Sequence, residues 1–152
     1  KYFRRQSGGL TMSGVHKDFH GAISCAFQFL DERYGIDVLD EFLEQVGKNC
    51  YRELIFKINQ DGLLAIEEYW NRIFTLEDGE FKIDRDEDSI TLELKRCPAI
   101  SHLLEVGYPV YRDFCRQTRM INSIIAKETG LEYTVESQQN KACCIQKFWR
   151  RK

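Results

Sequence analysis

The chain has 152 residues, of which 43% are hydrophobic and 30% charged, and this composition is typical of a single globular domain. The 22 Lys and Arg residues nearly balance the 24 Asp and Glu residues, so the formal net charge is only −2. This balance argues against a nucleic-acid or anionic-membrane partner, and no apolar run approaches the roughly 18 residues of a membrane-spanning helix. We therefore expect one soluble domain, with residues 1–17 as an N-terminal arm or loop and residues 18–149 as the core.

The first half of the chain shows helical spacing of apolar residues in three stretches. The first begins at Phe19, with Asp18 as the expected N-cap and Gly35 just past the end. The second covers residues 38–59 without interruption, and the third covers residues 63–74. Three helices are therefore expected before the first strand.

The second half alternates between strand-like and helix-like patterns. Residues 81–83 and 90–94 have the period of two that predicts a β-hairpin, with an acidic turn at residues 84–88. Helices are expected at residues 99–106 and 110–129, followed by strands at residues 131–135 and 142–149. The order ααα-ββ-αα-ββ predicts an α+β fold with a four-stranded, mainly antiparallel sheet and about five helices.

The six cysteines show no regular disulfide framework. Free cysteines often behave as small hydrophobic residues in protein cores. We therefore expect reduced thiols and a cytoplasmic location.

His16, Asp18 and His20 form the first candidate site. Two histidines four residues apart with an aspartate between them could supply metal ligands. The alternative interpretation is a polar junction that caps the first helix, because the segment spans the expected loop–helix boundary.

Cys97 and His102 form the second candidate site. Cys97 ends a strand just before a helix, where unpaired amides can lower the pKa of a thiol, and His102 could act as its acid–base partner. The strand alternation places Arg96 inward and Cys97 outward unless a β-bulge intervenes, and an inward Arg96 could bind a carboxylate. The alternative is a packed strand end with a surface histidine.

Cys115 and Cys144 complete the set of candidate residues. Cys115 lies on the apolar side of a helix, and Arg116 belongs to a basic row beside it that could bind a carboxylate or simply be solvated. Cys143 and Cys144 are adjacent in a strand, so we expect them to point to opposite faces, one to the core and the other to solvent or to a site.

Three short motifs resemble, in this order, the L-2-amino-thiazoline-4-carboxylic acid hydrolase-like family. They are Arg96-Cys97-Pro98, Phe114-Cys115 and the closing segment from Cys144 to Phe148. The resemblance covers about residues 30–149 and implies hydrolytic opening of a five-membered amino-thiazoline ring. Under this resemblance, Cys97, Cys115 and Cys144 correspond to cysteines of the family. The resemblance implies no mechanism for them.

The main functional hypothesis is a hydrolase that opens a small cyclic C=N or C–N substrate. Cys97 would be the reactive thiol and His102 the acid–base group, and the substrate would be bound by Arg96, Arg116, Cys115 and Cys144. The alternative is a non-enzymatic sensor that binds a small molecule or metal and resembles 4-vinyl reductase-type domains. A third hypothesis is a subunit that pairs with a second copy through an apolar helix face. The sequence leaves the cofactor open.

Overall fold

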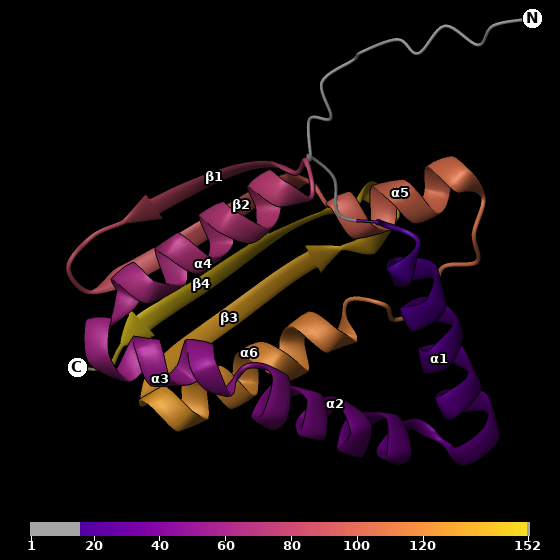
Figure 1. Cartoon of the computed structure of the whole chain (residues 1–152), viewed down its shortest axis with the longest axis horizontal. Helices are drawn as coiled ribbons and strands as arrows, with labels where there is room; N and C mark the ends of the chain where they lie inside the picture. The colour runs from indigo at the N-terminus through magenta and orange to yellow at the C-terminus, as the bar shows by residue number, and fades with distance from the viewer. Residues whose placement is uncertain (1–15, 152) are drawn as a thin grey trace, which may run out of the picture.

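The computed structural model describes residues 16–151, which form six α-helices and a four-stranded antiparallel sheet (Figure 1). The helices are α1 (Phe19–Tyr34), α2 (Ile36–Cys50), α3 (Arg52–Asp61), α4 (Leu63–Leu76), α5 (Pro98–Val106) and α6 (Arg116–Thr129). The strands are β1 (Glu80–Arg85), β2 (Ser89–Arg96), β3 (Leu131–Gln138) and β4 (Cys143–Arg150), with a short 3-10 turn at Gln139–Lys141. The predicted α+β class is confirmed, with one helix more than expected. Residues 1–15 of the predicted N-terminal arm lie outside the described residues.

The extra helix arises from a break at Tyr51. The backbone of Tyr51 leaves the helical region at φ −105° and ψ 6°, so the expected single helix over residues 38–59 is wrong. The Tyr51 ring packs edge-on against Tyr69 of α4, with ring centroids 6.1 Å apart. The break allows α2 to pack against α6 while Leu54 and Ile58 of α3 reach the core beside the sheet.

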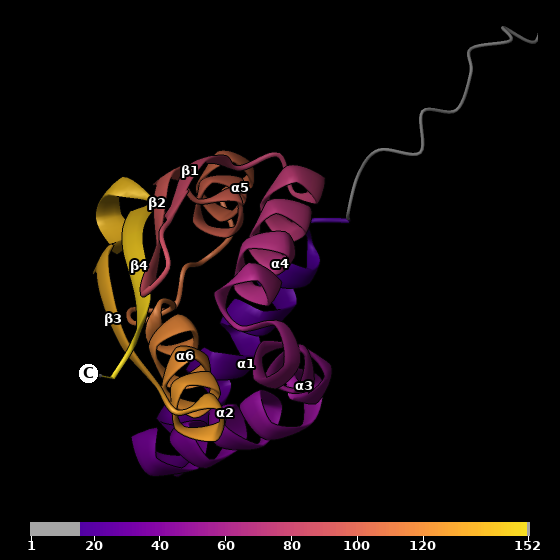
Figure 2. The ribbon, with the colours of Figure 1, turned by 90° about the vertical axis from the view of Figure 1, so that its left-hand side faces the viewer.

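The sheet carries all the helices on one face (Figure 2). Its strand order is β1-β2-β4-β3, and every neighbouring pair is antiparallel. Along β2, Ile90, Leu92 and Leu94 are buried while Glu93 is exposed, which is the alternation of a sheet with one covered face. Within the described part of the chain, no helix is both long enough and apolar enough to cross a membrane.

The segment before α6 is not helical as expected. The prediction of a helix over residues 110–129 is wrong in its first part, because α6 begins only at Arg116. Buried Ser24 of α1 holds the preceding segment: its hydroxyl accepts a hydrogen bond from the Tyr111 amide at 2.7 Å and donates one to the Pro109 carbonyl at 2.9 Å. These bonds compete with helical ones and keep Tyr111 and Phe114 buried without a helix.

Two clusters of buried apolar side chains form the core. The sheet cluster lies between the sheet and helices α3, α4 and α6, and includes Leu54, Ile58, Ile66, Trp70, Ile90, Leu92, Leu94, Ile121, Ile125 and Phe148. The helical cluster joins α1, α2 and α5 to the segment before α6, and includes Phe27, Leu39, Leu43, Ile100, Leu103, Tyr111 and Phe114. Cys97 packs against both clusters, which places it where they meet.

Candidate functional site: a cavity lined by thiols

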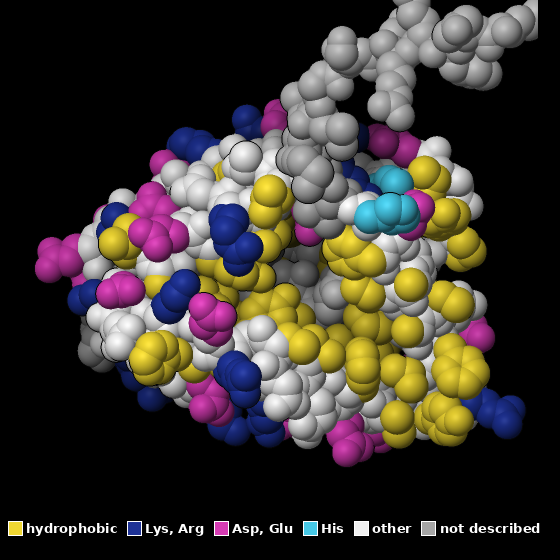
Figure 3. All heavy atoms as spheres, in the orientation of Figure 1, with side chains coloured by type: hydrophobic (Ala, Val, Ile, Leu, Met, Phe, Trp, Pro, Cys, Tyr) yellow, Lys and Arg dark blue, Asp and Glu magenta, His cyan; other side chains and the backbone are white. Residues whose placement is uncertain are grey.

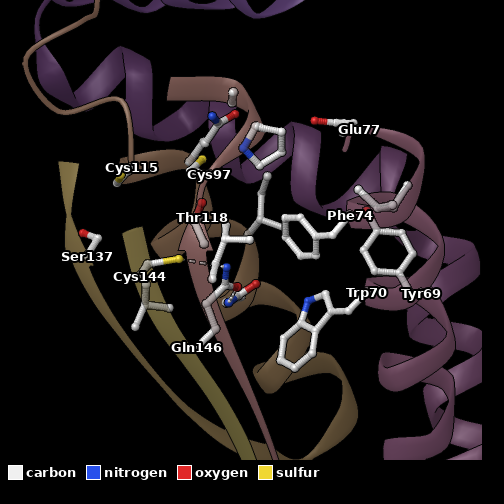
Figure 4. Close-up of a pocket in the computed structure, with 18 of the residues that line it drawn as sticks. Tyr69, Trp70, Phe74, Glu77, Cys97, Cys115, Thr118, Ser137, Cys144 and Gln146 are labelled. Atoms are coloured by element: carbon white, nitrogen blue, oxygen red, sulfur yellow. Dashed lines mark hydrogen bonds between the residues drawn. The ribbon is translucent and has the colours of Figure 1, made fainter. Parts of the chain in front are cut away.

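A cavity of about 310 Å³ lies between the sheet and the helices, where the two core clusters meet. In the space-filling view, hydrophobic side chains surround a hollow near the middle of the face drawn (Figure 3). Aromatic side chains of α4, among them Tyr69, Trp70 and Phe74, line one side of the cavity. Cys97, Cys115 and Cys144 lie on the other side (Figure 4).

Cys97 reaches the cavity because β2 contains a bulge. Glu80 of β1 pairs with Arg96 and Phe81 pairs with Leu94, so Lys95 is the extra residue. A bulge turns two successive side chains, here those of Lys95 and Arg96, to the same outer face of the sheet. The next side chain, that of Cys97, therefore points to the inner face. Arg96 is therefore half-exposed and forms an ion pair with Glu105 outside the cavity. The expectation that Arg96 points inward is wrong.

Cys115 and Cys144 join Cys97 at the cavity wall. Cys115 lies at the N-cap position of α6, and its amide donates a hydrogen bond to the side chain of Gln139 at 3.2 Å. Cys144 lies in β4 and accepts a hydrogen bond from Gln146 Nε2 at 3.5 Å. Cys143 is also among the residues that line the cavity.

Burial favours the protonated form of three of the cavity thiols, those of Cys97, Cys115 and Cys144. Burial raises the pKa of Cys97, although the nearby backbone amides of Ile100 and Ala99 at the start of α5 act in the opposite direction. Burial also raises the pKa of Cys115 to about 11 and that of Cys144 to about 11. The expected lowering of the Cys97 pKa is therefore wrong in its net direction, because loss of hydration outweighs the helix amides.

We expect alkylation to start at the two thiols outside the cavity. Cys25 and Cys50 are exposed, whereas the four other cysteines line the cavity. Brief treatment with iodoacetamide near neutral pH, followed by mass-spectrometric mapping, should label Cys25 and Cys50 first, because a buried neutral thiol is both inaccessible and weakly nucleophilic. In urea, all six should react at similar rates. Early labelling of Cys97 in the native protein would contradict this expectation.

Two buried amides form a polar part of the cavity wall. Asn122 of α6 donates a hydrogen bond from Nδ2 to Gln146 Oε1 of β4 at 2.9 Å, and both residues are buried. Nearby, the indole nitrogen of Trp70 faces the cavity (Figure 4), and it has no hydrogen-bond partner among residues 16–151. The cavity thus presents a few fixed hydrogen-bonding groups within an apolar lining, as binding sites for small molecules do.

His20 and Glu77 form a buried pair at one end of the cavity. His20 Nε2 lies 3.0 Å from Glu77 Oε2, with side-chain exposures of 8% and 13%. His20 belongs to the first turn of α1, and Glu77 caps the C-terminal end of α4. The pair joins the two helices beside Phe19 and Phe74 and brings a carboxylate and an imidazole to the cavity.

His102 and Arg116 do not line the cavity. His102 follows Cys97 by five residues, which places it about 140° around the helix from the thiol. Its Nε2 lies 2.9 Å from Asp18 Oδ1. Arg116 donates two hydrogen bonds to Asp40 of α2, at 2.5 and 2.6 Å, so it joins two helices. The expected roles of His102 as acid–base group and of Arg116 as substrate ligand are therefore not supported by their positions.

The three candidate metal ligands do not converge. His16 is exposed and lies 3.8 Å from Asp18, whose other oxygen contacts His102, while His20 points inward to Glu77. Asp18 occupies the expected N-cap position of α1, but its side chain makes no hydrogen bond to the start of the helix. Among the described residues, no three His, Cys, Asp or Glu side chains are arranged to hold a metal ion.

Comparison with known proteins adds no assignment to this geometry. Neither the family models nor the curated proteins searched include a match to the chain.

Proposed function

We propose that this chain binds a small, mainly apolar molecule in the cavity between the sheet and the helices. The observation that carries the proposal is the lining itself. Aromatic rings and neutral thiols surround a space of about 310 Å³, and a few amide, hydroxyl and indole groups interrupt the apolar surface. A cavity of this size suits a ligand of roughly ten to fifteen non-hydrogen atoms.

The state of the thiols supports binding over nucleophilic attack. The pKa of Cys97 is raised by burial, and His102, the expected base, lies outside the cavity lining. A neutral thiol without a base in contact is a weak nucleophile, but it contributes polarizable apolar surface to a ligand site. The chain would then act as a sensor or carrier domain, in a reducing compartment such as the cytoplasm that keeps its thiols free.

The experiment uses 2-naphthylmethanol, a neutral probe of about twelve non-hydrogen atoms. Isothermal titration calorimetry should detect binding to the full chain. Thr118 of α6 points into the cavity (Figure 4), so Thr118→Phe should fill part of the space and weaken binding at least about tenfold.

Thr91→Phe is the matched control. Thr91 belongs to β2 but lies between Ile90 and Leu92, and so faces away from the helices. This variant should bind the probe with an affinity within about twofold of the wild type, because it adds the same ring on the other face of the sheet. Absence of wild-type binding, or equal weakening in both variants, would contradict the proposal.

A second proposed function is hydrolysis of a small ring that contains a C=N bond, as the family resemblance implies. Two observations favour it. Cys97 occupies the N-cap position of α5, beside the free amides of the helix start, and the His20–Glu77 pair lines the same cavity and could transfer protons. The Cys97 thiol would add across the C=N bond, with sulfur bonding to carbon and the proton passing to nitrogen. The ring C–S bond of an aminothiazoline would then break, with the ring sulfur leaving as a thiol that takes a proton from the exocyclic amine, so the carbon stays bonded to the Cys97 sulfur and regains a C=N bond. Water would add to that carbon and the Cys97 sulfur would leave, one proton of the water passing to nitrogen and the other to the Cys97 thiol, which gives a urea.

The hydrolase proposal is tested with 2-amino-2-thiazoline and its 4-carboxylate. Chromatography should show that wild-type protein consumes at least one of the two compounds with time. This turnover should depend on Cys97 and not on Cys25. Cys97→Ser should abolish turnover while retaining the binding of 2-naphthylmethanol, and Cys25→Ser should change neither. Unchanged compounds after prolonged incubation with wild-type protein would remove this second proposal and leave the binding function standing.

A further inference from the structure

The charges around the cavity bear on the class of ligand that it accepts. Its lining includes one carboxylate, that of Glu77, and one histidine, His20. No Lys or Arg side chain among residues 16–151 lines it. Three nearby arginines are paired with carboxylates outside the lining: Arg96 with Glu105, Arg116 with Asp40 and Arg119 with Asp113. Arg119 also donates a hydrogen bond to the Ser137 hydroxyl at the cavity wall.

Glu77 is placed to receive a cation. It follows the last residue of α4, where the helix carbonyls add partial negative charge to that of the carboxylate. His20 contacts Oε2, while Oε1 accepts no hydrogen bond from any side chain that the structure describes. The rings of Tyr69 and Phe74 line the cavity on the same side (Figure 4), and an aromatic face also attracts cations.

We infer that the cavity selects ligands by charge: it accepts an apolar ring that carries a basic nitrogen, with that nitrogen at Glu77, and rejects the matching carboxylate. A carboxylate in this space would lose its hydration, meet no Lys or Arg side chain from the described residues and lie near the carboxylate of Glu77, which already occupies the only histidine of the described lining, His20. The amides at the start of α5 and the amide of Asn122 can offer hydrogen bonds, but they carry no formal charge. This inference rests on the proposed binding function.

The test compares three probes of nearly equal size with the full chain: 2-naphthylmethylamine, 2-naphthylmethanol and 2-naphthoate. The amine should bind at least about tenfold more tightly than the alcohol, and the naphthoate should be the weakest, since a charge-assisted hydrogen bond in a buried site is worth about that factor. Glu77→Gln should remove the advantage of the amine over the alcohol. Glu80→Gln, which changes an exposed glutamate outside the cavity lining, should preserve it.

The outcomes separate the inference from the proposed function. If the alcohol binds but the naphthoate binds as well as the amine or better, the charge selection is overturned and the binding function stands. If none of the three probes binds, both the charge selection and the proposed binding function are contradicted. Should Glu77→Gln fail to fold, as judged by circular dichroism, the order of the three probes on the wild-type protein still decides the charge selection.

Discussion

Replacing Phe148 with alanine is expected to lower the free energy of unfolding by about 4 kcal/mol. Phe148 is 1% exposed on the central strand β4, and its ring packs against Trp70 and Tyr133 with centroid distances of 6.0 and 6.2 Å. It also lines the cavity, so alanine would enlarge an existing space instead of allowing the core to close around the lost ring. The cost of such a substitution rises with the volume left empty.

Urea unfolding monitored by circular dichroism, in the presence of a reductant, measures this loss. Ile145→Ala is the matched control, because Ile145 belongs to the same strand and is 43% exposed. It should cost less than about 1 kcal/mol. Equal losses for the two variants would show that β4 is not packed against the helices through Phe148.

Local patterns in the sequence predict most of the fold. The period of two at Ile90, Leu92 and Leu94 identifies β2 and its buried face, and Gly35 and Gly130 mark the ends of α1 and α6. The break at Tyr51 escapes prediction because no Gly or Pro marks it, and the apolar spacing continues from α2 into α3. Its cause lies in packing against α4, which is distant in the sequence.

The candidate site is predictable only in part. Cys97, Cys115 and Cys144 stand out in the sequence, and all three line the cavity. The position of Arg96 does not follow from the sequence, because the bulge at Lys95 depends on pairing with β1. A bulge exchanges the faces of the sheet to which Arg96 and Cys97 point. The alternation of residues within β2 cannot show whether such a bulge occurs.

The polar residues of the cavity mostly escape prediction. The sequence suggests His20 only as a metal ligand. In the structure His20, Ser24 and Phe27 are the buried positions of α1. Gln146 stands between Cys144 and Phe148 on one face of its strand, and Asn122 stands one helical turn before Ile125 and Ala126. That interruption of a buried face is the signal that could have identified them.

Raising the pH from 9 to 11 is expected to lower the free energy of unfolding by about 2 to 4 kcal/mol through the cavity thiols. Burial holds the pKa of Cys115 and that of Cys144 at about 11, whereas thiols in the unfolded chain titrate near pH 8.5 to 9. Between these values the unfolded state releases protons that the folded state retains. Stability is therefore fully present below about pH 8.5 and falls as the pH rises toward 11. The range allows for partial screening by solvent, since both cysteines are only partly buried.

A double variant, Cys115→Ala and Cys144→Ala, separates the thiols from other groups that ionise at high pH. The pKa values of Tyr51 and Tyr69 are also raised by burial, so tyrosine ionisation adds to the alkaline loss in both proteins. Urea unfolding at pH 8, 9 and 10 with a phosphine reductant should give a shallower decline for the double variant than for the wild type. The comparison uses the slope against pH and not the absolute stability, because removal of two packed side chains lowers stability at every pH. Parallel slopes would mean that Cys115 and Cys144 are already hydrated in the folded protein, and the dry, neutral lining on which ligand binding depends would not exist.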